Sequence, residues 1–289
     1  MKSIWKDIQK NYTSGTNFIK LLYINVGVFL IYSVLLSVSL LFSKDINQMV
    51  NFLEFPASII KFIKKPWTIL SYMFFHVQFF HLLFNMIGLH FGSKLFLQYF
   101  NGKQLLSVYI LGGISGGIFY MLCFNNLPAF TNNIDDSVLL GASASVYSII
   151  IAICCYIPNY RVPLLIGNIQ LKYIAILLII IALVNIGFDA GNLSHLGGAI
   201  FGFLYVYLLR KGMDISVNFY NLIGCFSISK RNKLRKTHKR SQKSNKDIFL
   251  SKKADKQKKI NIILEKISKS GYESLSKEEK EMLFKESKK

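Results

Sequence analysis

Residues 193–210 read LSHLGGAIFGFLYVYLLR, and this stretch decides the fold class. It is almost wholly apolar or small-residue, and Arg210 and Lys211 close it. A helix needs about 20 such residues to cross the hydrocarbon core of a bilayer. The stretch therefore predicts a transmembrane helix over residues 193–209. His195 lies near its start, and ionisable side chains inside membrane helices are costly and often functional.

Five further apolar blocks precede this one, over residues 18–42, 79–96, 105–124, 141–157 and 171–188. The first block is too long for a signal peptide, whose apolar region has about 7–15 residues, and it lacks a small-residue cleavage site. The fourth block is short for a bilayer, so its helix can start beneath the membrane surface. Residues 44–78 form a long connection with apolar patches, which favours a position in the membrane interface. The sequence predicts an all-α membrane protein with six transmembrane helices.

The charges predict how these helices are oriented. The chain carries a net charge of +20. From Lys211 onward there are 22 of its 35 Lys and Arg but nine of its 15 acids, so this part alone carries +13. Lys and Arg gather on the cytoplasmic side of membrane proteins. This rule predicts a cell-membrane protein with both termini in the cytoplasm, and it explains the basic balance without nucleic-acid binding. The connection that holds Lys44, Lys61, Lys64 and Lys65 is the exception, because it is basic on the predicted outer side.

Four regions follow from this pattern: a cytoplasmic N-terminus (1–17), the six-helix membrane domain (18–210), a basic linker (211–255) and a small helical hairpin (256–289). The linker is expected to be disordered and to lie against anionic membrane lipid. In the hairpin, apolar residues recur at helical spacing, namely Ile260, Ile263, Leu264 and Ile267. Gly271 is placed to cap that helix. Ser276 and Glu279 form a capping box that opens a second helix toward Met282 and Leu283. The partner of this tail is not indicated.

The cysteines give no sign of a cofactor. There are four of them: Cys123, Cys154, Cys155 and Cys225. They show neither CxxC spacing nor a partnering histidine pattern, so neither a disulfide framework nor a zinc site is indicated. We expect no metal and no cofactor.

Polar residues in the predicted helices converge on one side of the membrane. The second, fourth and sixth helices run in the same direction, and each has a polar residue near its outer end: His81, Ser143 and His195. Asn85 lies one turn after His81 and so shares its face. Each of these residues alone fits an interhelical hydrogen bond or a tight helix contact. Their joint placement at similar depth favours a functional site.

Ser115 is a competing candidate for the nucleophile. Residues 113–117 read GISGG and match the G-x-S-x-G pattern of a nucleophile elbow more literally than the sequence around Ser143 does. That elbow needs a strand before the serine and a helix after it, whereas Ser115 lies in the middle of the third helix. Ser143 follows a polar loop and opens a helix, where free N–H groups favour a developing oxyanion. The sequence favours Ser143.

Three motifs, taken in order, resemble the rhomboid family. The second helix gives His76-Val-Gln-Phe-Phe-His81-Leu-Leu-Phe-Asn85, similar to the family's H-x4-H-x3-N. The fourth gives Gly141-Ala-Ser143-Ala144-Ser-Val-Tyr147, and the sixth gives an H-x2-G-x3-G motif from His195 to Gly202. Pro66-Trp67 with Ser71-Tyr72 also resembles the region that opens the family's second span. Ala144 stands where the family usually has glycine, and Thr68 where many members have arginine.

The resemblance implies an intramembrane serine protease that cleaves transmembrane substrates, with a six-helix fold around a water-filled cavity. Ser143 would be the nucleophile and His195 its base, without a carboxylate. The oxyanion would be held by the Ser143 backbone N–H, His81 and Asn85, with His76 and Gly141 beside them, and Tyr147 would pack on the His195 ring. An inactive rhomboid-like protein that binds membrane clients is the alternative. A transporter with a midplane polar site is disfavoured, since the chain shows no internal repeat.

Overall fold

The chain divides into two compact units, Met1–Ile228 and Ser229–Lys289, which are described separately. In the first unit the computed structural model describes residues 12, 15–164, 167–187, 189 and 191–226. In the second it describes residues 262–263, 265–267, 271 and 274–281. The side chains of residues 164 and 221–226 are not described.

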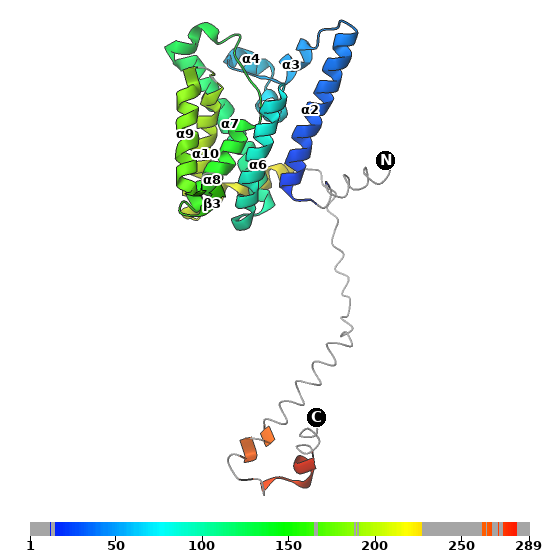
Figure 1. The fold of residues 1–289 in the computed structure, drawn as a ribbon, viewed down its shortest axis with the longest axis vertical. Helices are drawn as coiled ribbons and strands as arrows, with labels where there is room; N and C mark the ends of the chain where they lie inside the picture. Colours follow the sequence, from blue (N-terminus) through cyan, green and yellow to red (C-terminus); the bar gives the residue numbers. More distant parts are fainter. Residues whose placement is uncertain are drawn as a thin grey trace. The chain divides into compact units, whose positions relative to one another are not determined.

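The first unit is a helical bundle (Figure 1). Its α-helices are α2 (Asn17–Leu41), α3 (Asn47–Leu53), α4 (Ile59–Lys64), α5 (Thr68–Ser71), α6 (Phe79–Tyr99), α7 (Gly102–Asn126), α8 (Ser143–Tyr156), α9 (Leu171–Val184), α10 (Asn192–Arg210) and α11 (Ile215–Phe226). Among the described residues, three 3₁₀ turns join them: η1 (Tyr72–Phe74), η2 (Pro128–Asn133) and η3 (Asn185–Gly187). The same part of the chain also forms two short antiparallel pairs, β1 (Phe55–Pro56) with β2 (Val138–Leu139), and β3 (Arg161–Leu164) with β4 (Gly167–Gln170).

Each of the six apolar blocks forms a helix, and these helices differ in length. Among the described residues, α2, α7 and α10 are long and apolar enough to cross a membrane. The pair Thr68–Phe74 and Phe79–Tyr99 adds a fourth candidate span, bent by 92° at the break. The remaining two helices, α8 and α9, are shorter. The 14 residues of α8 extend for about 21 Å at 1.5 Å per residue, less than the roughly 30 Å of a bilayer core. The chain is a membrane protein with a helical bundle, and the count of six spans stays a prediction.

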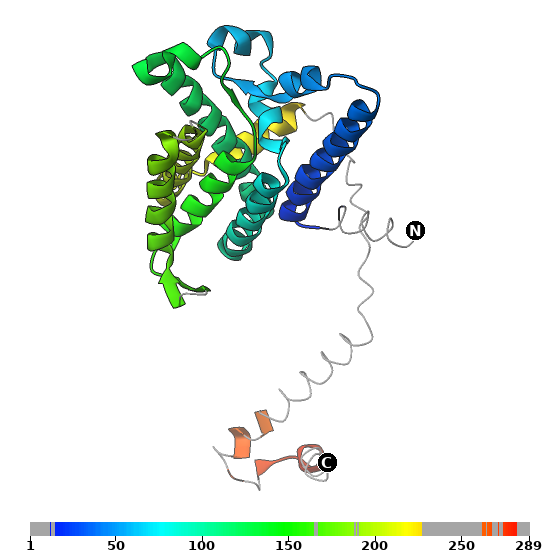
Figure 2. The same cartoon turned by 45° about the horizontal axis from the view of Figure 1, so that its top comes forward.

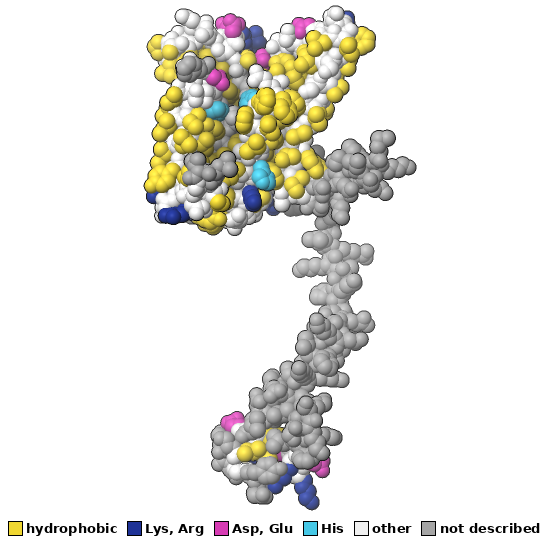
Figure 3. All heavy atoms as spheres, in the orientation of Figure 1, with side chains coloured by type: hydrophobic (Ala, Val, Ile, Leu, Met, Phe, Trp, Pro, Cys, Tyr) yellow, Lys and Arg dark blue, Asp and Glu magenta, His cyan; other side chains and the backbone are white. Residues whose placement is uncertain are grey.

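The wall of the bundle is apolar, as expected of a surface that faces lipid. Large hydrophobic side chains stand exposed along it, for example Phe80 and Phe84 of α6 and Val184 of α9. Figure 3 shows hydrophobic side chains covering much of one face, with acidic side chains gathered toward one end of the bundle. An apolar surface of this extent on a soluble protein would promote association.

Helices α7, α8 and α10 form the centre of the bundle, and glycines set how closely they pack. A methyl group added at Gly198 of α10 would overlap the backbone carbonyl of Ala144 in α8. One turn further, a methyl at Gly202 would overlap the carbonyl of Ser148. The backbones of α8 and α10 therefore touch, a contact that small residues make possible in membrane helices.

Helix α2 packs against the bundle along its first two thirds only. Its buried residues, Leu21, Asn25 and Tyr32, all lie there, and the Asn25 amide donates to the Tyr109 hydroxyl at 3.2 Å. Toward Leu41 the helix diverges from α6 (Figures 1 and 2), and its side chains become exposed.

The structure differs from the sequence prediction just after α10. Residues 211–255 were expected to be a disordered linker, yet Ile215–Phe226 form the helix α11. The Asp214 carboxylate opens this helix by accepting hydrogen bonds from the backbone N–H and the hydroxyl of Ser216 at 2.9 and 2.6 Å. It also accepts from the Gln104 amide at 3.0 Å, which ties α11 to the start of α7. The sequence prediction missed this helix because it was based on the average composition of residues 211–255, which is strongly basic although residues 215–226 are largely apolar. Residues 227–255 lie outside the described part of the chain.

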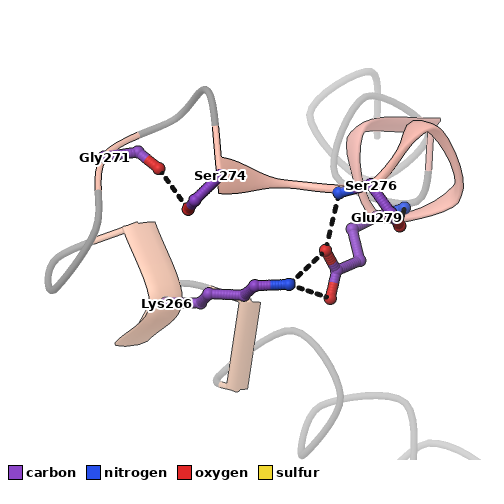
Figure 4. Close-up of polar contacts among 5 residues, drawn as sticks. All are labelled: Lys266, Gly271, Ser274, Ser276 and Glu279. Atoms are coloured by element: carbon purple, nitrogen blue, oxygen red, sulfur yellow. Dashed lines mark hydrogen bonds and ion pairs between the residues drawn. The ribbon is translucent and has the colours of Figure 1, made fainter.

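The second unit contains the two caps that its sequence predicted, and Figure 4 shows the contact between Ser276 and Glu279 in the second of them. Gly271 has a φ of +78° and its N–H donates to the Ile267 carbonyl at 2.9 Å, as expected of a glycine that ends a helix. The Ser276 hydroxyl accepts from the Glu279 N–H at 3.2 Å, and the Glu279 carboxylate accepts from the Ser276 N–H at 2.8 Å. Lys266 reaches the same carboxylate at 2.9 Å. Ile260, Leu264, Met282 and Leu283 lie outside the described residues.

Candidate active site

The two most distinctive side chains of the bundle, Ser143 and His195, meet where α8 and α10 begin. Ser143 is the first residue of α8, and His195 lies in the first turn of α10. The distance between Ser143 Oγ and His195 Nε2 is 2.7 Å, within hydrogen-bond range. The Tyr147 ring, one turn after Ser143, stacks on the imidazole with a centroid distance of 4.5 Å and an interplanar angle of 14°. The contact fixes the plane of the imidazole, so its nitrogen faces the serine.

The loop before α8 is held by backbone geometry that requires glycine. Gly141 has a φ of +108°, a conformation that side-chain-bearing residues rarely adopt. A methyl group at this position would also lie 2.5 Å from Cε1 of His81. The Gly141 N–H donates to the Tyr72 carbonyl at 2.9 Å. Gly141 therefore lets the His81 ring approach the chain two residues before Ser143.

His76 supports this loop from the inside. Its side chain is fully buried, and its Nε2 accepts a hydrogen bond from the Ala142 N–H at 3.2 Å. The His76 and His81 rings are in edge contact, with centroids 5.2 Å apart. The structure thus places His76 behind the loop, where it contacts the backbone immediately before Ser143.

Asn85 lies one turn below His81 on α6, as its spacing predicts. It is 6% exposed, and one N–H of its side-chain amide donates to the His81 carbonyl at 2.9 Å. A side-chain amide has two N–H groups, so the second is available for another acceptor.

The competing serines have structural partners. The Ser115 hydroxyl donates to the Gly197 carbonyl at 3.0 Å and so joins α7 to α10. Ser145 is buried, and its hydroxyl lies 3.9 Å from the Met73 sulfur. Neither of these bonds involves a histidine.

The structure describes no carboxylate in hydrogen-bond contact with the imidazole. The acid nearest in sequence is Asp189, and its carboxylate accepts from the Gly191 N–H at 2.8 Å. When the serine hydroxyl donates to Nε2, a neutral imidazole carries its proton on Nδ1. Nδ1 of His195 is buried and, within the described part of the chain, has no hydrogen-bond partner. Among the described residues there is also no cluster of three or more His, Cys, Asp or Glu that would hold a metal.

Tyr72 is a residue of this site whose role the sequence did not indicate. Its side chain is fully buried, its carbonyl holds Gly141, and its hydroxyl donates to the Gly113 carbonyl at 2.6 Å. It therefore connects the loop before α8 to α7. The sequence could have indicated this role only through the position of a tyrosine inside a short apolar segment. A tyrosine buried in such a segment usually forms a hydrogen bond through its hydroxyl.

Comparison with known proteins assigns a family to the part of the chain that holds these residues. The Rhomboid domain family matches residues 64–212, about half of the chain and the part that contains all of these side chains. The chain belongs to the rhomboid family. A second family, of unknown function (DUF6576), matches residues 246–289 of this rhomboid.

Two Arabidopsis thaliana proteins are among its relatives. RHOMBOID-like protein 5 is 27% identical over 149 residues, which are 50% of this chain and 45% of that protein. The mitochondrial RHOMBOID-like protein 12 is 25% identical over 221 residues, 72% of this chain and 62% of that protein. This rhomboid therefore spans about half of the first relative's length and less than two thirds of the second's.

Proposed function

We propose that this rhomboid is an intramembrane serine protease that cleaves transmembrane proteins with a Ser143–His195 dyad. The 2.7 Å contact between Ser143 Oγ and His195 Nε2 carries the proposal. A hydroxyl becomes a useful nucleophile when a base within about 2.6–3.2 Å takes its proton. Family membership supports the same activity.

The reaction follows from the positions of these groups. Ser143 Oγ attacks the scissile carbonyl carbon while its proton passes to His195 Nε2. The imidazolium then donates that proton to the leaving amine, and the peptide C–N bond breaks to give an acyl-enzyme. A water molecule, deprotonated by the same nitrogen, releases the acyl group and restores the serine.

The oxyanion formed in each step needs donors. The N-terminus of α8 leaves backbone N–H groups without helical partners, and the Ser143 N–H is the first of them. The other proposed donors are the second N–H of the Asn85 amide and the His81 ring. Both residues lie on α6, and the His81 ring approaches the loop before α8 at Gly141. In this proposal His76 and Gly141 position the loop rather than touch the substrate.

The same proposal places the protein in the membrane. Six spans put both termini on one side, and the basic residues of the chain favour the cytoplasm for that side. The short helix α8 would begin below the outer surface, where water must reach Ser143. The cell membrane is the proposed location. The proposed partners are membrane lipids and transmembrane protein substrates.

The test is cleavage of a generic single-span substrate by the purified full-length protein in detergent. Ser143→Ala removes the nucleophile and is expected to abolish cleavage. The matched control, Ser145→Ala, removes the same atoms two residues later and should retain it. If wild type fails to cleave a panel of such substrates and a fluorophosphonate does not label Ser143, the chain is instead a rhomboid-like protein that binds clients without cutting them.

A further inference from the structure

An apolar groove opens on the wall of the bundle, and neither Ser143 nor His195 lines it. It lies between α9 and α10, has α8 as its floor, and has a volume of about 410 Å³. Its lining is apolar and includes Ile151, Cys155, Ala175, Leu183, Leu196 and Ala199. Other lining side chains, such as Ile200 and Phe203, are about half exposed, so the groove opens to the surroundings of the bundle.

The groove has the dimensions of one lipid acyl chain. It extends along α9 from Ala175 to Leu183, and eight residues of helix rise by about 12 Å. Half of a bilayer's hydrocarbon core is about 15 Å thick. An apolar cavity of about 150 Å³ holds the six carbons of benzene, so 410 Å³ has room for roughly 16 carbons.

Two basic residues, Arg210 and Lys211, follow on α10 and just after it, beyond Leu204, the last α10 residue that lines the groove. Arg210 donates from Nη2 to the carbonyl of Cys155, a lining residue, at 2.8 Å, and to that of Tyr156 at 3.3 Å. Because both bonds come from Nη2, the N–H groups on Nη1 and Nε still point to possible acceptors. Lys211 follows directly, with its ammonium 4.5 Å above the Tyr207 ring. Among the described residues no carboxylate forms an ion pair with Arg210 or Lys211.

We propose that this groove is a binding site for a single anionic glycerophospholipid. One acyl chain would lie between α9 and α10, and the phosphate would be held by Arg210 and Lys211. Two cations without a paired carboxylate favour a headgroup with net negative charge over a zwitterionic one, and basic pockets between membrane helices bind such headgroups. The proposal does not depend on protease activity, because the groove and the dyad share no residue.

The test is native mass spectrometry of the purified full-length protein with phosphatidylglycerol or phosphatidylcholine of identical acyl chains. Wild type is expected to retain one phosphatidylglycerol, and several-fold less phosphatidylcholine. Ala175→Leu with Ala199→Leu fills the groove and should abolish retention of both lipids. Its control, Val34→Phe, adds bulk to an exposed position on α2 and should change nothing.

Two further variants test whether the lipid headgroup is recognised. Arg210→Gln should lower retention of phosphatidylglycerol to that of phosphatidylcholine. Lys94→Gln removes an exposed cation of α6 that does not line the groove, so it should keep the preference. Equal retention of the two lipids by wild type overturns the anionic site, and full retention in the filled variant overturns the groove.

A labelling experiment covers the case in which the filled variant does not fold. Phosphatidylglycerol with a diazirine in the middle of one acyl chain is photolysed with the wild-type protein, and the labelled peptides are identified. Labels on α9 and α10 are expected, at or next to Ile179 and Ile200. Labels confined to other helices overturn the proposal whatever the variants do.

Discussion

Replacing Gly198 by alanine tests whether the α8–α10 contact sets the distance of the dyad. The new methyl carbon would lie 2.9 Å from the Ala144 carbonyl carbon and 3.1 Å from its Cα. The methyl would also overlap the Ala144 carbonyl oxygen. Because carbon–oxygen contacts are no shorter than about 3.3 Å, the two helices must separate by at least roughly 1 Å. If α10 carries His195 with it, the 2.7 Å bond to Ser143 lengthens to about 3.7 Å, beyond the range of about 2.6–3.2 Å for proton transfer.

The expected losses follow from that shift. A misplacement of 1 Å can lower a rate about 100-fold, so this shift corresponds to a loss of roughly 100-fold in cleavage. Overpacking should also lower the free energy of unfolding by about 1–3 kcal/mol. The assays are the cleavage rate of a single-span substrate, the rate of fluorophosphonate labelling at Ser143, and thermal unfolding in detergent.

The matched control is Gly27→Ala in α2. A methyl at Gly27 meets no atom within 4 Å, and alanine is the better helix former by about 1 kcal/mol. This variant should therefore unfold no more easily than wild type and should cleave at the same rate. If Gly198→Ala folds and cleaves as fast as Gly27→Ala, the close approach of α8 and α10 does not position the dyad.

Four further outcomes are expected. Tyr147→Phe keeps an aromatic ring on His195 and should retain the rate of substrate cleavage. Tyr147→Ala should lower that rate by roughly tenfold, because the imidazole loses its orientation. Ala144→Gly should lower the free energy of unfolding by about 1 kcal/mol through helix propensity while cleavage continues, as thermal unfolding and the same cleavage assay would show. Hydrogen bonds from the Ser276 N–H, and then from Lys266, hold the pKa of Glu279 below its usual value of 4.5. The stabilisation that ionised Glu279 gives its cap is therefore fully present above pH 4.5, and it is lost as the pH falls through the lowered pKa. The backbone amide resonances of the capping box should therefore shift only in acid, and in Glu279→Gln they should not titrate there. Removing residues 229–289 should leave fluorophosphonate labelling intact, because the dyad and its loop lie wholly within the first unit; loss of labelling in a truncated protein that still elutes as one folded species would contradict this.

Hydrophobic blocks predict the helices of this protein well because lipid imposes a simple rule. A backbone inside a bilayer must satisfy its own hydrogen bonds, so each long apolar block becomes a helix whatever it packs against. The observed bounds of α2, α6 and α10 lie within a few residues of the sequence prediction. The same rule does not apply to polar or interfacial segments. The structure therefore departs from the sequence prediction at α11, and it adds short helices between Asn47 and Ser71 on which the sequence made no prediction.

The sequence predicts those residues of the site whose side chains are energetically costly to place in a membrane. It does not predict the residues that act through main-chain hydrogen bonds. His195 and His81 stand out because an ionisable side chain is expensive in lipid. Tyr72 and Ala142 escape sequence reasoning, because each acts through a main-chain group, a carbonyl that holds Gly141 and an N–H that binds His76. A main-chain contact leaves no residue-type signature, so only the fold brings it to light.

In the proposed dyad, helix packing rather than a third charged group orients His195. A histidine base in a serine hydrolase is commonly aligned by a carboxylate on Nδ1, yet here Nδ1 of His195 is buried without a partner among the described residues. The imidazole is instead held by a ring stacked at 14° on one side and by a helix whose backbone touches α8 at Gly198 and Gly202. A carboxylate buried in lipid would need its own partners to offset desolvation. Close packing through glycine and an aromatic ring supplies the same orientation without placing a charge in the membrane.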